Sequence, residues 1–273
     1  MVIGIATRLA VERDSQRSFF GTSEGKKWLV DALKMATLTS IPSVQNLEVK
    51  PAYWFVLVDS TLGFTLRQEI QETFGSGTSV PIRLVFTNGW EDSSSALKST
   101  PEAEKCTIQV RLDYDDMLHK SFIRKMVESS FSIDDDCCLI SPSNGICREL
   151  DPQRFAQIKK ELPPFLALYR RGEFRELSIF SFDHDKWPDE LVHELLTSPL
   201  WIQTITGNNI ANRFGRGWKV KSLRYLKKLN LEPWTGESLL LFTSTSFVRF
   251  RNCAEFVREL SLNLRGAIRR AWR

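Results

Sequence analysis

Residues 53–59 read YWFVLVD, a continuous run of aromatic and β-branched side chains that ends in an aspartate, Asp59. Apolar side chains on both faces of a strand are typical of a parallel sheet that helices cover on each side. Further strands are predicted at residues 3–6, 82–86 and 106–112. Apolar residues at helical spacing precede and follow the run, near residues 28–36 and 65–74. This alternation predicts an α/β domain with a doubly wound sheet.

The second half of the chain has weaker patterns. Strands are predicted at 139–140, 177–182 and 201–205, and helices at 117–131 and 189–196. The polar stretch 91–104 is predicted to be a loop or a short helix. Residues 254–272 carry apolar side chains at a spacing of three to four, with arginines between them. That pattern predicts a basic amphipathic helix, which either docks on the domain or lies on an anionic membrane surface.

Composition excludes several classes of protein. The 273 residues are 42% hydrophobic and 26% charged, which is ordinary for a globular domain and excludes a disordered chain or a collagen. No apolar run approaches the length of about 18 residues that spans a bilayer. The N-terminus lacks the basic region of a signal peptide. The five cysteines include no C-x-x-C pair, and Cys137, Cys138 and Cys147 match no zinc module. Reduced thiols and a cytoplasmic location are therefore expected.

Charge is distributed unevenly along the chain. The net charge is +4, but residues 213–273 carry 14 basic and 4 acidic side chains, which leaves 23 basic and 29 acidic in the rest. A basic C-terminal segment suggests an anionic partner, such as ligand phosphates, a membrane surface or nucleic acid, although a solvated surface would have the same composition.

Three carboxylates, those of Asp113, Asp115 and Asp116, directly follow the strand predicted at 106–112. Ligands of doubly wound sheets bind outside the carboxyl ends of the strands, where Asp59 is also expected. Carboxylate oxygens suit Mg²⁺ or Mn²⁺, which could act as a Lewis acid on a pyrophosphate leaving group. The alternative is an acidic turn that caps the next helix. No G-x-S-x-G, P-loop or G-x-G-x-x-G motif is present.

Four stretches together carry a resemblance to a known family: residues 5–8 (IATR), 38–45 (LTSIPSVQ), 111–116 (RLDYDD) and 201–210 (WIQTITGNNI). In this order they resemble GT-A-fold glycosyltransferases with a D-x-D motif, and are most similar to the rhamnosyltransferase family of bacterial polysaccharide clusters. One departure concerns Thr206, which stands where that family usually has a histidine before the glycine.

The resemblance implies a GT-A-like, Rossmann-like mixed sheet flanked by helices over residues 1–220, with a basic extension over 221–273. It implies a nucleotide-diphosphate sugar donor, a bound Mn²⁺ or Mg²⁺ ion, and a saccharide acceptor. The family label suggests rhamnose as the sugar. The implied donor contacts are Thr7, Arg8, Asp59, Arg111, Asp113, Asn208, Asn209 and Arg213. The implied metal ligands are Asp113, Asp115 and Asp116.

An inverting transfer also needs a base within hydrogen-bond reach of the acceptor hydroxyl. Asp185 is the first candidate, followed by His184 and Glu190, whereas His193 is expected to be structural. Two other functions stay open. One is a non-catalytic nucleotide- or carbohydrate-binding protein of this fold, which would be consistent with Thr206 at the position where the family usually has a histidine. A nucleic-acid-binding protein or metal-dependent nuclease would use the basic C-terminal segment, but the acidic first part of the chain argues against nucleic acid as a partner.

Overall fold

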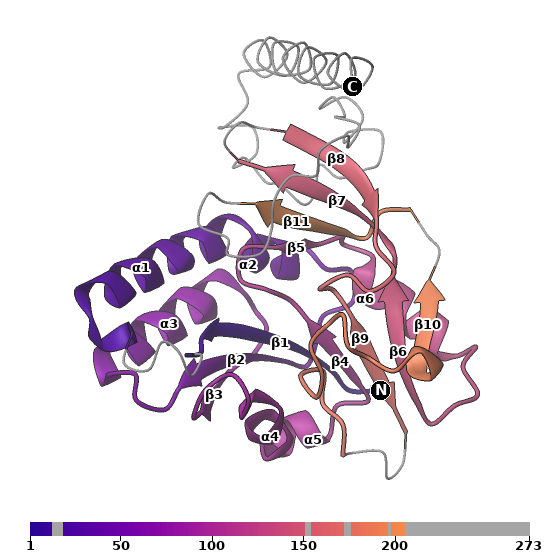
Figure 1. Cartoon of the computed structure of the whole chain (residues 1–273), viewed down its shortest axis with the longest axis horizontal. Coiled ribbons are helices and arrows are strands. Elements are labelled where there is room, and N and C mark those ends of the chain that lie inside the picture. The colour runs from indigo at the N-terminus through magenta and orange to yellow at the C-terminus, as the bar shows by residue number, and fades with distance from the viewer. Residues whose placement is uncertain (13–18, 151–153, 172–175, 196–197, 206–273) are drawn as a thin grey trace, which may run out of the picture.

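The computed structural model describes residues 1–12, 19–150, 154–171, 176–195 and 198–205. Within them the chain forms a seven-stranded and a four-stranded sheet (Figure 1). The predicted extension 221–273, its basic helix, and Asn208, Asn209 and Arg213 lie outside the described residues. The boundary at residue 220 and the membrane contact therefore stay predictions. Of the described helices, none combines the length and the apolar character that crossing a membrane requires.

The seven-stranded sheet forms the centre of the molecule. Its order is β10-β6-β9-β4-β1-β2-β3, and only β9 runs antiparallel to its neighbours β4 and β6. Its strands are β1 Ile3–Ala10, β2 Tyr53–Asp59, β3 Ile82–Thr87, β4 Ile108–Arg111, β6 Cys137–Pro142, β9 Ala167–Arg170 and β10 Val192–Leu195. This mixed, mainly parallel sheet confirms the predicted α/β fold class.

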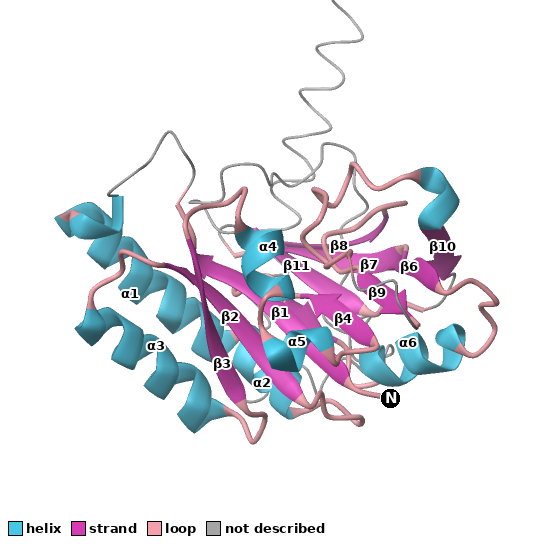
Figure 2. Ribbon diagram, turned by 90° about the horizontal axis from the view of Figure 1, so that it is seen from below, coloured by secondary structure: helices cyan, strands magenta, loops and turns pink. Residues whose placement is uncertain are grey.

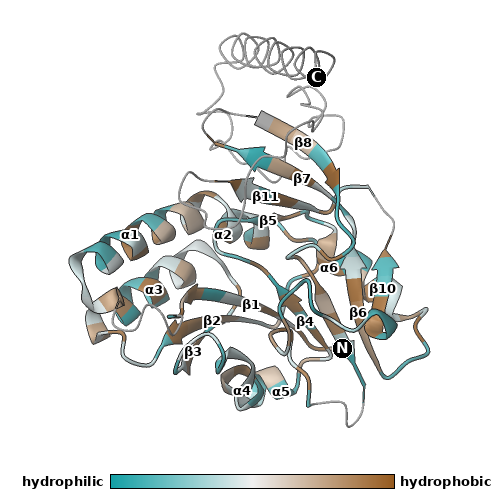
Figure 3. Cartoon of the chain, in the orientation of Figure 1, coloured by the Kyte–Doolittle hydropathy of each residue, from teal (hydrophilic) through white to brown (hydrophobic). Residues whose placement is uncertain are grey.

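Helices and a long loop cover the two faces of this sheet (Figure 2). Trp54, Val56 and Val58 of β2 face one hydrophobic core, and Phe55 and Leu57 face the other. The first core is closed by α1 Ser23–Leu38, α2 Ser40–Gln45, α3 Phe64–Gly77 and α6 Phe122–Ser130. The second is closed by α4 Ser93–Lys98, α5 Pro101–Glu104 and loop 177–187. Burial on both sides explains why the 53–59 run is continuous, and Figure 3 shows β1 and β2 as largely hydrophobic.

The four-stranded sheet stands beside the carboxyl end of β4. Its order is β5-β11-β7-β8, with β5 Met117–Leu118, β11 Trp201–Ile205, β7 Asn144–Glu149 and β8 Arg154–Lys159. The Trp201 indole lies over Gly145, where a Cβ atom would come 2.1 Å from the ring. It also stacks on Phe165 at a centroid distance of 4.7 Å. Gly145 is thus required because any side chain would displace Trp201.

Several predicted elements of the second half are wrong. Residues 117–131 do not form one helix, because Met117 and Leu118 pair with β11 and α6 begins only at Phe122. Residues 177–182 are a loop rather than a strand. Within the predicted helix 189–196, the described residues form a short 3-10 helix, Asp189–Leu191, followed by β10, so His193 lies on a strand. Pairing with distant strands decided residues 117–118 and 192–195, and that pairing outweighs a local pattern.

The cysteines behave as expected for the described part of the chain. Cys106, Cys137, Cys138 and Cys147 are buried thiols rather than disulfides. Burial raises the pKa of the Cys106 and Cys138 thiols to about 11. These thiols are therefore protonated and inert near neutral pH.

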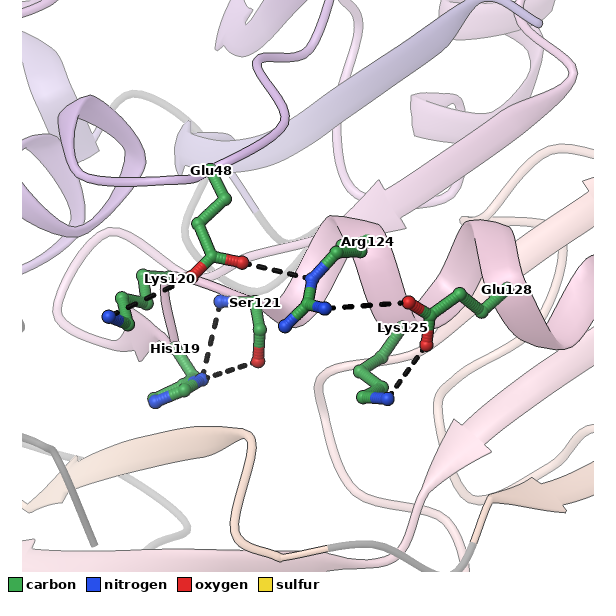
Figure 4. Close-up of polar contacts among 7 residues, drawn as sticks. All are labelled: Glu48, His119, Lys120, Ser121, Arg124, Lys125 and Glu128. Atoms are coloured by element: carbon green, nitrogen blue, oxygen red, sulfur yellow. Dashed lines mark hydrogen bonds and ion pairs between the residues drawn. The ribbon is translucent and has the colours of Figure 1, made fainter.

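A surface ion-pair network joins the loop before β2 to α6 (Figure 4). The Glu48 carboxylate lies 3.0 Å from Arg124 Nε and 3.7 Å from Lys120 Nζ. Glu128 extends the network, at 3.6 Å from Arg124 and 2.7 Å from Lys125. All these side chains are at least one third exposed, so solvent screens their attraction.

Glu48→Gln is therefore expected to lower the free energy of unfolding by less than about 1 kcal/mol. The loss should shrink further in high salt, because the ion pairs are exposed. Urea titrations of both proteins at low and high salt measure it. A salt-independent loss above about 2 kcal/mol would show that the pairs are not screened as their exposure indicates.

Candidate active site

The acidic loop, residues 112–116, leaves the carboxyl end of β4 and is held by three threonines. Thr7 Oγ1 donates to the Leu112 carbonyl at 2.6 Å, and Thr39 Oγ1 donates to the Tyr114 carbonyl at 3.0 Å. The Thr204 N–H donates to Asp116 Oδ1 at 2.7 Å. Each threonine comes from a different one of the stretches that carry the resemblance, so these stretches meet at one place in the fold.

The carboxylates of this loop are crowded and largely buried. Asp115 is 7% exposed and Asp116 is 2% exposed, whereas Asp113 is half-buried. Burial, and then the charges of Asp115 and Asp113, raise the pKa of Asp116 well above its usual range. Burial and the same group of carboxylates also raise the pKa of Tyr114. Such a cluster needs a compensating positive charge nearby.

Two cations adjoin the acidic loop. Arg111, the last residue of β4, is 6% exposed, and its Nε lies 3.5 Å from Asp113 Oδ1. Its Nη1 has no hydrogen-bond partner among the described residues. Lys160 follows β8 and donates from Nζ to Gln203 Oε1 at 2.7 Å. Burial lowers the pKa of Lys160, while the charges of Cys147 and Asp116 raise it.

A buried guanidinium with an unused donor is costly unless something polar meets it. The Arg111 fork therefore suits a bidentate anion such as a phosphate.

Arg8 and Asp59 lie at the same edge of the sheet, near the ends of β1 and β2. The Arg8 guanidinium is held 3.3 Å from the centroid of the Trp90 ring and 4.5 Å from that of Phe180. Asp59 Oδ1 accepts hydrogen bonds from Thr61 N at 2.9 Å and from Thr61 Oγ1 at 2.6 Å. Both predicted donor contacts are thus fixed in place by their neighbours.

Thr7 has a different position from the one that the resemblance implies. Its side chain is fully buried, and its hydroxyl accepts from Trp54 Nε1 at 2.9 Å while it donates to Leu112. The hydroxyl therefore supports the acidic loop from inside the sheet.

Loop 177–187 brings His184 and Asp185 to the acidic loop. It is anchored by Ser94 Oγ, which lies 3.0 Å from Ser178 Oγ, and by the Ile179 N–H, which donates to Gln109 Oε1 at 3.1 Å. Burial, and then the Arg111 charge, lower the pKa of the half-buried His184, while Asp185 and Asp113 raise it. His184 therefore lies near enough to Arg111 and Asp113 to feel their charges, and the exposed Asp185 follows it in the chain.

The structure does not bring Glu190 to this group. Glu190 is exposed on the 3-10 helix before β10, an edge strand that is separated from β4 by β6 and β9.

The donor chemistry of the acidic loop fits a divalent metal only in part. Among the described residues, no three His, Cys, Asp or Glu side chains are placed to hold one ion. Asp116 is engaged with Thr204, and Asp113 adjoins Arg111. Mg²⁺ is commonly held by one or two carboxylates plus substrate phosphates, and Asp113 and Asp115 fit that smaller set.

Sequence reasoning missed Lys160 and the aromatic pair around Arg8. Lys160 sits in an ordinary Lys-Lys pair, and no local signal distinguishes it. Trp90 and Phe180 are far apart in the chain and meet only at Arg8. These residues could be found only from the fold.

Comparison with known proteins gives similarities of structure alone. No protein-family profile matches the chain, and no curated protein matches it. S. aureus TarS in complex with UDP-GlcNAc is 11% identical, with a TM-score of 0.45 over 77% of this chain and 60% of that chain. HddC from Yersinia pseudotuberculosis is 10% identical, with a TM-score of 0.40 over 74% of this chain and 93% of that one.

Mouse xyloside xylosyltransferase 1 is 9% identical, with a TM-score of 0.35 over 66% of this chain and 71% of that one. The chain thus spans about three fifths of the length of the TarS chain that it matches. At these identities and TM-scores, the similarities assign the protein to no family.

Proposed function

We propose that the protein is a glycosyltransferase that moves a sugar from a nucleotide-diphosphate donor to a hydroxyl of a saccharide acceptor. The observation that carries the proposal lies at the carboxyl end of β4, where a buried, incompletely bonded Arg111 contacts Asp113 and the buried Asp115 follows in the same loop. A mainly parallel sheet binds ligands at this edge. Cations beside carboxylates suit a diphosphate that is bound together with a metal ion.

In this proposal each side chain has a definite task in binding the donor. Asp115, with Asp113, holds Mn²⁺ or Mg²⁺, which when bound would neutralise charge on the diphosphate leaving group. Arg111 donates its remaining N–H groups to a phosphate oxygen. Arg8 and Asp59 orient the nucleoside from the ends of β1 and β2. Asn208, Asn209 and Arg213 stay predicted donor contacts outside the described residues.

Acceptor activation is assigned to the loop above the site. Asp185 is exposed and follows His184, whose pKa is influenced by the charges of Arg111 and Asp113. In this proposal the exposed Asp185 carboxylate accepts the proton of the acceptor hydroxyl, as general-base catalysis requires. Rhamnose, the sugar that the resemblance suggests, is one donor sugar to test. A cytoplasmic location and contact of the C-terminal segment with an anionic membrane belong to the same proposal.

A thermal-shift screen of nucleoside diphosphates and nucleotide sugars, UDP-GlcNAc among them, tests the proposal with and without Mn²⁺. One nucleotide should stabilise the protein in a metal-dependent manner, by about 2.7 kcal/mol at 100 times its Kd. Mn²⁺ alone should give a much smaller shift, because the protein offers only one or two carboxylates.

Asp185→Asn is the matched control for this screen: it should keep the nucleotide shift and lose sugar transfer. A shift without turnover in the unmodified protein would instead support the non-catalytic binding protein. No shift with any nucleotide would contradict the proposal.

A further inference from the structure

The Asp116 side chain joins the acidic loop to β11, by accepting a backbone hydrogen bond of the kind that a neighbouring strand would otherwise accept. β5 pairs with β11 over only two residues, Met117 with Ile202 and Leu118 with Trp201. Asp116 directly precedes β5, and its Oδ1 accepts the Thr204 N–H at 2.7 Å across 88 residues of sequence. The carboxylate therefore accepts a backbone donor that lies just beyond the end of the β5–β11 ladder.

A second contact fixes the neighbouring residue of β11. Lys160 Nζ donates to Gln203 Oε1 at 2.7 Å, and the Lys160 backbone N–H donates to the Ser143 carbonyl at 2.8 Å. Lys160 also lies close enough to Asp116 for each charge to favour the ionised form of the other. Gln203 and Thr204 are thus held from β8 and from the acidic loop together.

We propose that Asp116 is a positioning residue, and not a metal ligand, that clips β11 to the acidic loop. The part of this inference that concerns the metal rests on the proposed function. The Asp116 oxygen is already committed to Thr204 in a side chain that is only 2% exposed, whereas Asp113 adjoins Arg111 at the open side of the loop. The clip fixes the acidic loop against β11.

Mn²⁺ titrations distinguish a ligand from a positioning residue. They are done on Asp116→Asn, Asp116→Ala and Asp115→Asn in the presence of the nucleoside diphosphate that gives the largest thermal shift. Asp116→Asn keeps an oxygen for the Thr204 N–H, so its Kd for Mn²⁺ should stay within about threefold of that of the unmodified protein. Loss of an outer-shell partner weakens metal affinity by about 10–100-fold, and loss of a metal ligand should weaken it at least as much. Asp115→Asn should show that larger loss, and Asp116→Ala should show a loss that Asp116→Asn rescues. Equal losses in Asp116→Asn and Asp115→Asn would make Asp116 a metal ligand and overturn the proposal.

Amide hydrogen exchange at Thr204, measured by NMR, tests the clip without any ligand. The Thr204 N–H should be protected in the unmodified protein and in Asp116→Asn, and should exchange at least about tenfold faster in Asp116→Ala. Unchanged protection in Asp116→Ala would overturn the clip. If the unmodified protein bound neither Mn²⁺ nor nucleotide, the proposed function would fail while this measurement still decided the role of Asp116. If Asp116→Ala did not fold, loss of Thr204 protection in Asp116→Asn would overturn the clip, and retained protection would support it.

Discussion

Asp115→Asn is expected to lower kcat/KM for sugar transfer by about 10²–10³-fold, the size of loss that follows removal of one group that stabilises developing charge. The substitution keeps the shape of a buried side chain and removes its negative charge. In the proposed site that charge holds the metal against the diphosphate, and the leaving group gains negative charge as the bond to the sugar breaks. Steady-state kinetics with the donor found in the thermal-shift screen measure the loss.

The control for this prediction is Asp31→Asn, which removes an exposed carboxylate of α1 and should leave kcat/KM unchanged. Asp115→Asn itself should retain its secondary structure and a cooperative unfolding transition, so that lost activity is not lost folding. An equal fall in kcat and in kcat/KM would show that the charge acts mainly in the transition state. Wild-type kinetics in Asp115→Asn would remove the acidic loop from the mechanism.

The central part of the fold could be predicted from the sequence because its signals are local. The 53–59 run is continuous because β2 is buried on both faces, and its final aspartate marks the carboxyl edge of the sheet. The three carboxylates after β4 are expected at the same edge, because β4 and β2 run parallel and their carboxyl ends meet there. The hydrophobic sequence pattern of these strands agrees with their burial in the structure. The strands and the position of the candidate site could therefore be predicted without knowledge of distant contacts.

Other features depend on contacts that no local pattern contains. The role of Asp116 follows from a partner 88 residues away, and in the sequence it is indistinguishable from the neighbouring Asp115. Residues 177–182 (LSIFSF) are mainly apolar and aromatic, as in a strand, yet Ser178 and Ser181 hydrogen-bond to Ser94 and to each other and hold the segment as a loop. Short serine and threonine side chains compete with sheet hydrogen bonds in this way.

Trp201→Ala is expected to lower the free energy of unfolding by about 3–5 kcal/mol, as for other large-to-small substitutions in a core. The indole is fully buried, stacks on Phe165, and donates from Nε1 to the Pro142 carbonyl at 2.6 Å. Its removal leaves a cavity over Gly145 and a buried carbonyl without its donor, which adds about 1–3 kcal/mol of desolvation cost to the loss. Denaturant titrations followed by circular dichroism measure the change.

Trp201→Phe separates the two contributions, because it keeps an aromatic ring against Phe165 and removes only the Nε1 donor and part of the volume. Its loss should be intermediate, about 1–2 kcal/mol. Because β11 also carries Thr204, the Trp201→Ala protein should bind the nucleotide and Mn²⁺ more weakly even where it is still folded. A loss of stability below about 1 kcal/mol in Trp201→Ala would show that the packing of Trp201 over Gly145 does not hold β11 in place. Weak binding with unchanged stability would instead indicate direct contact between Trp201 and the ligand, and would contradict the core position that its complete burial gives it.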